Sequence, residues 1–293
     1  MTDTHPSPTI GVIGGSGVYE IDGLRDARWE KVESPFGSPS DEILVGNIAD
    51  SRFAFLPRHG RGHPIPPSEI NYLANIDALK RLGVTDLISI SACGSLQEDL
   101  APGTFVLVDQ FVDRTVTRPR TFFGTGFVAH VSMASPVCQR LGDAVEGAAR
   151  ALEIPSVRGG TYLVMEGPQF SSRAESELYR SWGCDVIGMT NMPEAKLARE
   201  AEICYSTVAM VTDYDCWRDD HRAVEVGDIV EVLHNNADRG RSLVRAAAEE
   251  LGKRSFPCPD GCDRALDGAV ITAPGSRNPE IARRLDAVAS RIL

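Results

Sequence analysis

The chain has 293 residues, enough to bury the core of one large domain, or of one domain with an appendage. Its formal charge of −11 at pH 7 disfavours nucleic acid, because a polyanion would approach against the overall field of the protein. No apolar run approaches the roughly 20 residues of a membrane span, and residues 1–8 are polar. These features predict a cytoplasmic protein that binds neither membrane nor nucleic acid.

Apolar runs of strand length alternate along the chain with segments of helical periodicity. Strands are predicted at residues 9–13, 42–48, 52–56, 86–91, 105–109, 160–165, 185–189 and 203–212. Helices are predicted at 68–83, 137–152, 172–182, 194–201, 226–251 and 279–293. The alternation indicates an α/β fold, a single-domain three-layer sandwich with a mixed, largely parallel central sheet, to which a hairpin over 42–56 adds an antiparallel part.

The composition changes near Lys253, where a stretch rich in proline and glycine begins. We therefore expect a domain over residues 9–251 and a C-terminal extension over residues 252–293. The extension contains Cys258 and Cys262, for which a local disulfide, a metal site and two idle thiols are all open. Idle thiols are the default in a cytoplasmic protein, and Cys93, Cys138, Cys184, Cys204 and Cys216 each sit singly in apolar or periodic segments, as reduced core thiols do.

The first predicted strand runs into Gly14-Gly15-Ser16-Gly17. Glycines let backbone N–H groups approach an anion closely, and the serine adds a hydroxyl, so a phosphate is the natural ligand. A strand-turn without a ligand is equally compatible with the glycines alone. A dinucleotide-binding fingerprint fits the sequence less well, because the third glycine and the crossover helix that it requires do not follow.

Polar side chains follow several other predicted strands, and the carboxyl ends of strands are where such folds bind ligands. Arg58 and His59 supply a planar fork and an imidazole suited to phosphate oxygens, while a metal pair made by His59 and His63 is disfavoured because the loop is not helical. The turn from Ser91 to Ser95 offers hydroxyls and amides around a cysteine best interpreted as a packed thiol.

Two further strand ends carry groups that suit a purine. Phe170 could stack on a planar ring or be a core aromatic. Asp213 and Asp215 stand two residues apart beyond a buried strand, where carboxylates are costly to desolvate unless they meet donors. The exocyclic amine of an aminopurine, together with a protonated N7, would supply such donors, whereas a helix cap or an ion pair with Arg218 explains one carboxylate more easily than both.

Taken in order, these segments resemble a known family. The matching motifs are Gly14-Gly15-Ser16-Gly17, Pro35-Phe36-Gly37, Arg58-His59-Gly60, Asn71-Tyr72-x-Ala74-Asn75, Ala92-Cys93-Gly94-Ser95, Asp109-Gln110-Phe111-x-Asp113-Arg114-Thr115, Glu166-Gly167-Pro168-x-Phe170-Ser171-Ser172-Arg173-Ala174-Glu175-Ser176 and Thr212-Asp213-Tyr214-Asp215-Cys216-Trp217. Over roughly residues 9–251 the chain is similar to the S-methyl-5′-thioadenosine phosphorylases of the trimeric purine nucleoside phosphorylase superfamily. The resemblance implies a single α/β domain that assembles as a homotrimer.

The resemblance also implies residue roles. It assigns phosphate binding to Ser16, Arg58, His59, Ser91, Ala92 through its N–H, and Thr190. It places Met189 under the ribose, Phe170 and Ser171 beside the base, and Asp213 and Asp215 on adenine. It brings His130 across a subunit boundary to the 5′ end of the nucleoside, and lines the methylthio pocket with Val226, Ile229 and Val230, whose spacing independently indicates one face of a helix.

The implied reaction is phosphorolysis of methylthioadenosine, with catalytic roles for Arg58, His59 and Asp213 and with inorganic phosphate as co-substrate. It needs neither a metal nor an organic cofactor. A phosphorylase of 6-oxopurines is the nearest alternative, although a carboxylate facing O6 would be repelled. Adenosine is expected to be at most a slow substrate, a water-using nucleosidase would not need Arg58 with His59, and a non-catalytic nucleoside-binding protein would release no adenine.

Overall fold

The computed structural model describes residues 8–15, 21–218, 226–252 and 256–293. Within them, one sheet of eleven strands forms the middle of the molecule. The strands are β1 Thr9–Gly14, β2 Arg25–Glu30, β3 Ile43–Ile48, β4 Ser51–Pro57, β5 Val84–Ser95, β6 Phe105–Leu107, β7 Gln110–Asp113, β8 Ser156–Arg158, β9 Thr161–Val164, β10 Val186–Gly188 and β11 Cys204–Asp213. The helices are α1 Tyr72–Arg81, α2 Gln139–Ala151, α3 Arg173–Ser181, α4 Asn191–Glu200, α5 Val226–Leu251 and α6 Pro279–Arg284.

Strand β5 organises the sheet because it pairs along most of its length with β1 on one side and β11 on the other, both parallel. The sheet runs β2-β3-β4-β1-β5-β10-β9-β7, and β11 carries β6 and β8 on a second branch. Residues of β5 are almost all buried, as expected for a strand covered on both faces. Strands β2, β3 and β4 form the antiparallel edge, which confirms the predicted hairpin.

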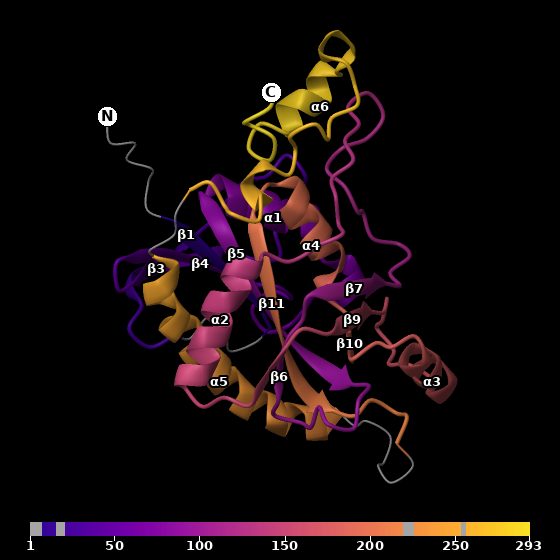
Figure 1. Cartoon of the computed structure of the whole chain (residues 1–293). Coiled ribbons are helices and arrows are strands. Elements are labelled where there is room, and N and C mark those ends of the chain that lie inside the picture. The colour runs from indigo at the N-terminus through magenta and orange to yellow at the C-terminus, as the bar shows by residue number, and fades with distance from the viewer. Residues whose placement is uncertain (1–7, 16–20, 219–225, 253–255) are drawn as a thin grey trace.

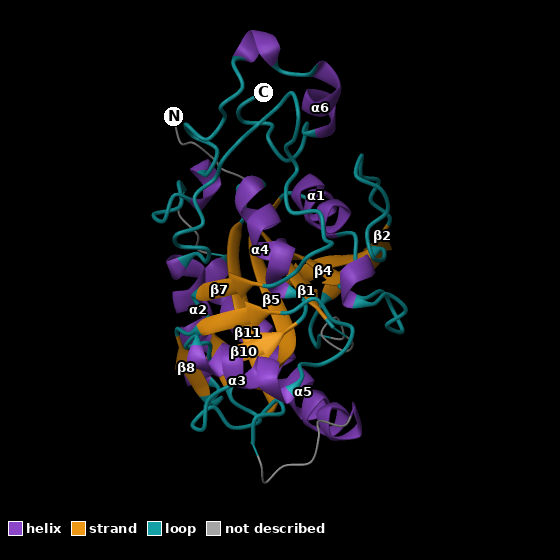
Figure 2. Ribbon diagram, turned by 90° about the vertical axis from the view of Figure 1, so that its right-hand side faces the viewer, coloured by secondary structure: helices purple, strands orange, loops and turns teal. Residues whose placement is uncertain are grey.

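Helices cover both faces of the sheet, so the predicted three-layer sandwich is confirmed (Figures 1 and 2). Helices α1 and α4 pack together over one face, and α2 and α5 pack together over the other. A smaller apolar cluster includes Tyr179 of α3 and Trp217 after β11. None of the helices among the described residues combines the length and apolarity needed to cross a bilayer.

The structure differs from the sequence expectation in local detail. Strands β2, β7 and β8 were not predicted, because β2 is a polar edge strand and the other two are only four and three residues long. The predicted helix over 68–83 is a short 3₁₀ turn followed by α1, since Ile70 is extended and the Asn71 side chain caps α1 by accepting from the Ala74 N–H. The terminal helix ends at Arg284 rather than Leu293.

The C-terminal segment packs against the rest of the chain, and Figure 1 shows it in yellow beside α1 and α4. Leu285, Val288 and Ala289 are buried in the same apolar cluster as residues of those helices. The Leu266 N–H donates to Glu202, whose carboxylate also accepts from Arg291. These contacts fix the segment on the core of its own subunit.

The cysteines depart furthest from expectation. Cys138 and Cys204 do not sit singly, and Cys258 and Cys262 are not two isolated thiols. The four sulfur atoms lie within 4.8 Å of one another, although they come from three distant parts of the sequence. Spacing along the chain gave no indication of this cluster, because only Cys258 and Cys262 are sequence neighbours.

Candidate active site

A cleft of about 280 Å³ opens where β4, β5, β10 and β11 end. Carboxyl ends of neighbouring strands meet at one edge of a sheet, so side chains that are distant in the sequence converge there. Nine residues predicted for the site line this cleft: Arg58, His59, Ser91, Ala92, Phe170, Met189, Thr190, Asp213 and Asp215.

Arg58 lies at the buried end of the cleft with 1% of its surface exposed. Its Nε donates to Glu194 at 2.9 Å, and its Nη2 donates to Glu194 and to the Ser89 hydroxyl. Burial opposes the charge on the guanidinium, but the charge of Glu194, its hydrogen bond and the neighbouring tyrosines together outweigh burial, so the pKa of Arg58 is raised above its ordinary value. Arg58 is therefore a fixed cation.

The expected fork of Arg58 onto two phosphate oxygens needs correction, because Glu194 already occupies one edge of the guanidinium. Nη1 donates to the Ile90 carbonyl at 2.9 Å. Nη1 carries a second hydrogen, for which the described residues supply no acceptor. Arg58 thus offers an anion one hydrogen and a buried positive charge, instead of a free bidentate fork.

His59 is neutral at ordinary pH in the ligand-free protein. Burial, with the nearby charge of Arg58 adding to it, lowers the pKa of His59 to about 4. Its Nδ1 lies 2.8 Å from the Ile65 carbonyl, so the neutral ring carries its hydrogen on Nδ1 and leaves Nε2 as an acceptor. The ring stacks on His63, with centroids 4.0 Å apart, a parallel arrangement that does not direct both imidazoles at one metal ion.

Binding of an inorganic phosphate dianion is expected to take up a proton at pH 7. Either Nε2 of His59 takes a proton from solvent beside the bound dianion, or the phosphate takes that proton and binds as the monoanion with a hydroxyl donating to Nε2, and either way the complex holds one proton more than the separated partners. Calorimetry in buffers of different ionisation enthalpy should show this uptake, and His59→Gln should remove it. A binding enthalpy independent of the buffer in the wild type would contradict this assignment.

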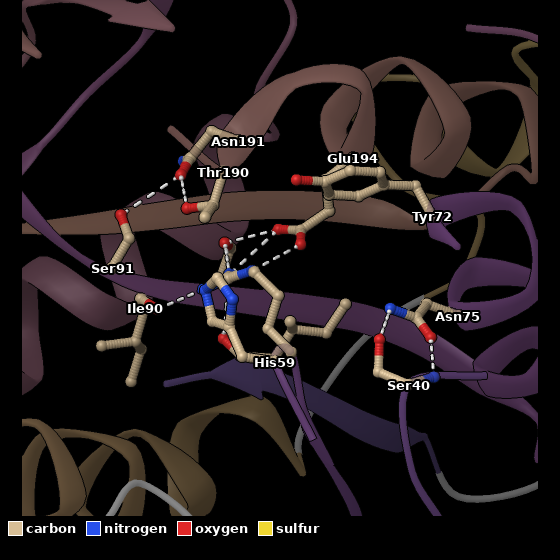
Figure 3. Close-up of polar contacts among 12 residues, drawn as sticks. Ser40, His59, Tyr72, Asn75, Ile90, Ser91, Thr190, Asn191 and Glu194 are labelled. Atoms are coloured by element: carbon tan, nitrogen blue, oxygen red, sulfur yellow. Dashed lines mark hydrogen bonds and ion pairs between the residues drawn. The ribbon is translucent and has the colours of Figure 1, made fainter. Parts of the chain in front are cut away.

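Two hydroxyl groups, those of Ser91 and Thr190, also line the cleft (Figure 3). The Ser91 hydroxyl at the end of β5 donates to the side-chain oxygen of Asn191 at 3.2 Å, and the Thr190 hydroxyl lies 3.5 Å from the same oxygen. Asn191 is completely buried and is itself bound to Thr207 on β11. The amide oxygen of Asn191 therefore holds both hydroxyl oxygens beside the cleft, and each hydroxyl can turn its single hydrogen from that oxygen to an anion.

The two carboxylates form the opposite end of the cleft. Asp213 accepts from the Thr212 hydroxyl at 2.7 Å and from the Asp215 N–H at 2.8 Å. Burial outweighs these bonds and raises the pKa of Asp213 above its ordinary value. Burial also raises the pKa of Asp215, with the charge of Asp213 adding to it, and Asp215 Oδ2 has no hydrogen-bonding partner within the described part of the chain.

Gly94 makes room for this pair. A Cβ on Gly94 would lie 3.0 Å from Asp213 Oδ1 and 3.3 Å from Asp215 Cβ. The glycine near the end of β5 thus permits a close approach of the end of β11 and the loop that follows it. An unpartnered, buried carboxylate oxygen beside a second carboxylate is a site prepared for a ligand that donates hydrogen bonds.

Comparison with known proteins decides the family. Residues 9–249 match the family model described as "Phosphorylase superfamily". The chain belongs to the phosphorylase superfamily. It is 64% identical over 293 residues to an S-methyl-5'-thioadenosine phosphorylase of Rhodospirillum rubrum, covering 100% of both chains. It is 63% identical over 284 residues to one of Cereibacter sphaeroides, covering 97% of this chain and 98% of the relative.

Solved structures give the same relationship for this superfamily member. A methylthioadenosine phosphorylase sourced from an antarctic soil metagenomic library superimposes with a TM-score of 0.91 at 44% identity, covering 97% of this chain and 99% of the other. The methylthioadenosine phosphorylase from Schistosoma mansoni in complex with adenine superimposes with a TM-score of 0.82 at 37% identity, covering 89% and 98%. The family predicted from the ordered motifs is therefore confirmed.

Some residues expected at the site of this superfamily member lie elsewhere. Ser171 lines a neighbouring hollow with Glu175 and Tyr179 instead of the cleft. His130 is exposed and lines a third hollow with Lys196 and Glu200. Ser16 lies outside the described residues. Val226, Ile229 and Val230 have helical backbone at the start of α5, but their side chains are also outside the description.

The structure adds residues that sequence reasoning missed. Glu194 binds Arg58 and also accepts from the Tyr205 hydroxyl at 3.0 Å. Arg118 is buried and donates to the carbonyls of Met189 and Glu166, and so ties together two loops that border the cleft. An acidic residue at the start of a predicted apolar helix was an available signal for Glu194. Arg118 lies in a segment with no predicted element, and nothing in its sequence context set it apart.

Phe170 and Met189 both line the cleft. Phe170 is 47% exposed although it lines the cleft, so the alternative of a core aromatic is wrong. Cys93 is buried in the same cleft wall, and burial raises its pKa well above the ordinary value. Its thiol therefore stays protonated, in agreement with a packed rather than nucleophilic cysteine.

Proposed function

We propose that this chain catalyses the phosphorolysis of S-methyl-5′-thioadenosine, converting it with inorganic phosphate to adenine and 5-methylthioribose 1-phosphate. The observation that carries the proposal is the polarity of one cleft, with a buried cation and hydroxyls at one end and two buried carboxylates at the other. Relatives of 60–64% identity that bear this activity in their names support it.

At the phosphate end, Arg58 supplies charge and one hydrogen, His59 supplies Nε2, and Ser91 and Thr190 supply hydroxyls. The backbone N–H of Ala92 and the hydroxyl of Ser16 complete the proposed set. Because Glu194 holds Arg58 in place before any ligand arrives, the cation needs little reorganisation when phosphate binds, and the Ser91 and Thr190 hydroxyls need only rotate their hydrogens from Asn191 toward the phosphate. The bound phosphate then attacks C1′ of the ribose.

At the purine end, Asp213 and Asp215 accept hydrogen bonds from adenine. Cleavage of the N-glycosidic bond builds positive charge on the ribose and negative charge on the departing base. The phosphate stabilises the first charge, and a proton delivered to N7 by Asp213 neutralises the second. The raised pKa of Asp213 suits this role, because a larger fraction of the group is protonated than for an ordinary aspartate at the same pH.

The sugar is proposed to lie between these ends over Met189, with Phe170 bordering the base and Ser171 just beyond it, in the hollow that shares Phe170 and Met165 with the cleft. We propose that the chain works as a homotrimer in which His130 of a neighbouring subunit reaches the 5′ end, since His130 is exposed and lies outside the cleft of its own chain. Val226, Ile229 and Val230 are proposed to contact the methylthio group. No metal or organic cofactor takes part in this scheme, and a cytoplasmic location stays a prediction.

The direct test is the initial rate of free-base release from methylthioadenosine, methylthioinosine, adenosine and inosine, each with and without phosphate. We expect phosphate-dependent release that is fastest with methylthioadenosine. Adenosine should be slower by roughly 10- to 200-fold, the discrimination that an apolar pocket provides. Release without phosphate would indicate a nucleosidase, faster inosine compounds would indicate an oxopurine enzyme, and either result would overturn the proposal.

A further inference from the structure

Four buried cysteines, hereafter the thiol cluster, lie away from the cleft and have no part in the proposed reaction. They are Cys138, Cys204, Cys258 and Cys262, each at most 4% exposed. All four sulfur atoms lie within 4.8 Å of one another, and those of Cys138 and Cys258 are 3.8 Å apart. All four are free thiols in the structure.

Separate elements bring the thiol cluster together. Cys138 stands at the N-terminus of α2, and its N–H donates to the Tyr205 carbonyl, which places it beside Cys204 at the start of β11. Cys258 and Cys262 follow α5 in a tight turn, closed by the Gly261 N–H donating to the Cys258 carbonyl. Gly261 has φ +67°, a conformation that favours glycine.

The geometry fits a single tetrahedral ion. A zinc ion about 2.3 Å from each of four thiolates puts the sulfur atoms about 3.8 Å apart, which is the observed Cys138 to Cys258 separation. Iron–sulfur clusters hold their cysteines around several irons and so need wider spacing, and hard cations prefer oxygen ligands. A closed site of four cysteines is the usual composition of a structural zinc site.

The surroundings suit the charge of such a site. Zinc with four thiolates carries a net charge of −2, and the Arg140 guanidinium pairs with Asp86, which lies directly opposite Cys204 in the neighbouring strand. The Cys138 thiol lies 3.3 Å from Asp260, whose carboxylate is also held by the Arg140 N–H, so the thiol proton has an adjacent acceptor when it leaves.

We propose that the thiol cluster is a structural zinc site that fastens the segment after α5 to the start of β11 and the N-terminus of α2. Zinc binding replaces the four thiol protons, which pass to solvent, and involves no oxidation or reduction. The ion would join residues 256–293 to the sheet at a point separate from the active-site cleft, so loss of zinc is expected to lower stability while the cleft residues stay in place.

The first test measures the metal content of the purified, dialysed full-length chain by elemental mass spectrometry. We expect about one zinc per chain, and less than about a tenth of that in the double variant Cys258→Ser with Cys262→Ser. Cys184→Ser is the matched control, because Cys184 is also a buried free thiol but lies outside the thiol cluster, and it should keep its zinc. Removing zinc with a chelator should lower the Tm of the wild type and of Cys184→Ser.

A second measurement needs no variant. Exchange of cobalt(II) into the wild type under reducing conditions should give the thiolate charge-transfer bands and the strong visible absorption of a tetrahedral site. A wild-type chain that binds neither zinc nor cobalt when reduced would overturn the proposal, and so would iron in place of zinc, disulfides between these cysteines in freshly purified protein, or equal loss of zinc from Cys184→Ser. These readouts do not depend on the proposed phosphorolysis.

Discussion

Asp213→Asn is expected to lower kcat/KM for methylthioadenosine by roughly 10²–10⁴-fold, the usual contribution of a general acid. The amide oxygen can still accept from the Asp215 N–H, and the Thr212 hydroxyl, which faces the other carboxylate oxygen, can donate to the Cys93 carbonyl instead, so the loop should hold its shape. It cannot transfer a proton to N7. It can donate to a 6-oxo group, so the ratio of activity on methylthioinosine to activity on methylthioadenosine should rise. Initial rates of base release with both substrates measure the two effects.

Glu98→Gln is the matched control for this variant. Glu98 pairs with Arg218 just beyond the same loop, at 3.6 Å, and does not line the cleft. The substitution removes one acidic charge near the loop of Asp213 without touching the base. The kcat/KM of Glu98→Gln should therefore stay within about twofold of the wild type, as expected for an ion pair whose carboxylate is largely exposed. Asp213→Asn with near-normal activity and unchanged substrate preference would refute the role of Asp213.

Arg58 is expected to show the second large effect, and its variants separate charge from geometry. Arg58→Lys keeps the charge but loses the fork that Glu194 and Ser89 hold, so the KM for phosphate should rise by roughly tenfold or more while the KM for the nucleoside changes little. Arg58→Met leaves Glu194 buried without its partner and should destabilise the chain by about 3–5 kcal/mol. Phosphate titrations of the rate and denaturant unfolding at fixed protein concentration measure these outcomes.

Arg61→Lys provides the comparison for Arg58. Arg61 is in the same loop, but its side chain is 42% exposed and pairs with Asp41 and Glu42 at the surface. Such an ion pair at the surface contributes little to stability, because water and salt screen the charges, and Arg61 does not line the cleft. If Arg61→Lys raised the KM for phosphate as much as Arg58→Lys, the anion site would have to be reassigned to the loop as a whole.

Much of the fold could be predicted because its signals are local. Most of the buried strands are recognisable as β-branched apolar runs. The helices are recognisable by their periodicity and by caps such as Ser172 with Glu175 before α3. The missed elements lack those signals. Strand β2 is polar because one edge of the sheet faces water, and it exists only because β3 offers a partner.

Part of the candidate active site could be predicted in the same way, because several of its residues also carry local signals. The candidate catalytic groups Arg58 and Asp213 follow recognisable strands directly, so each could be picked out from its own stretch of sequence. Their partners could not. Glu194 lies 136 residues after Arg58, and only the packing of α4 over the sheet brings its carboxylate to the guanidinium.

The sequence by itself determined the alternation of strands and helices, the ordered motifs and therefore the family, because each depends on residues close together in the chain. Tertiary structure alone decided that Arg58 is already paired, that two carboxylates share one buried end of the cleft, and that four cysteines meet. Each of these depends on long-range packing, which desolvates charges and gathers soft ligands from β11, α2 and the segment after α5. The spacing of residues along the chain does not indicate which distant residues come together in the folded protein.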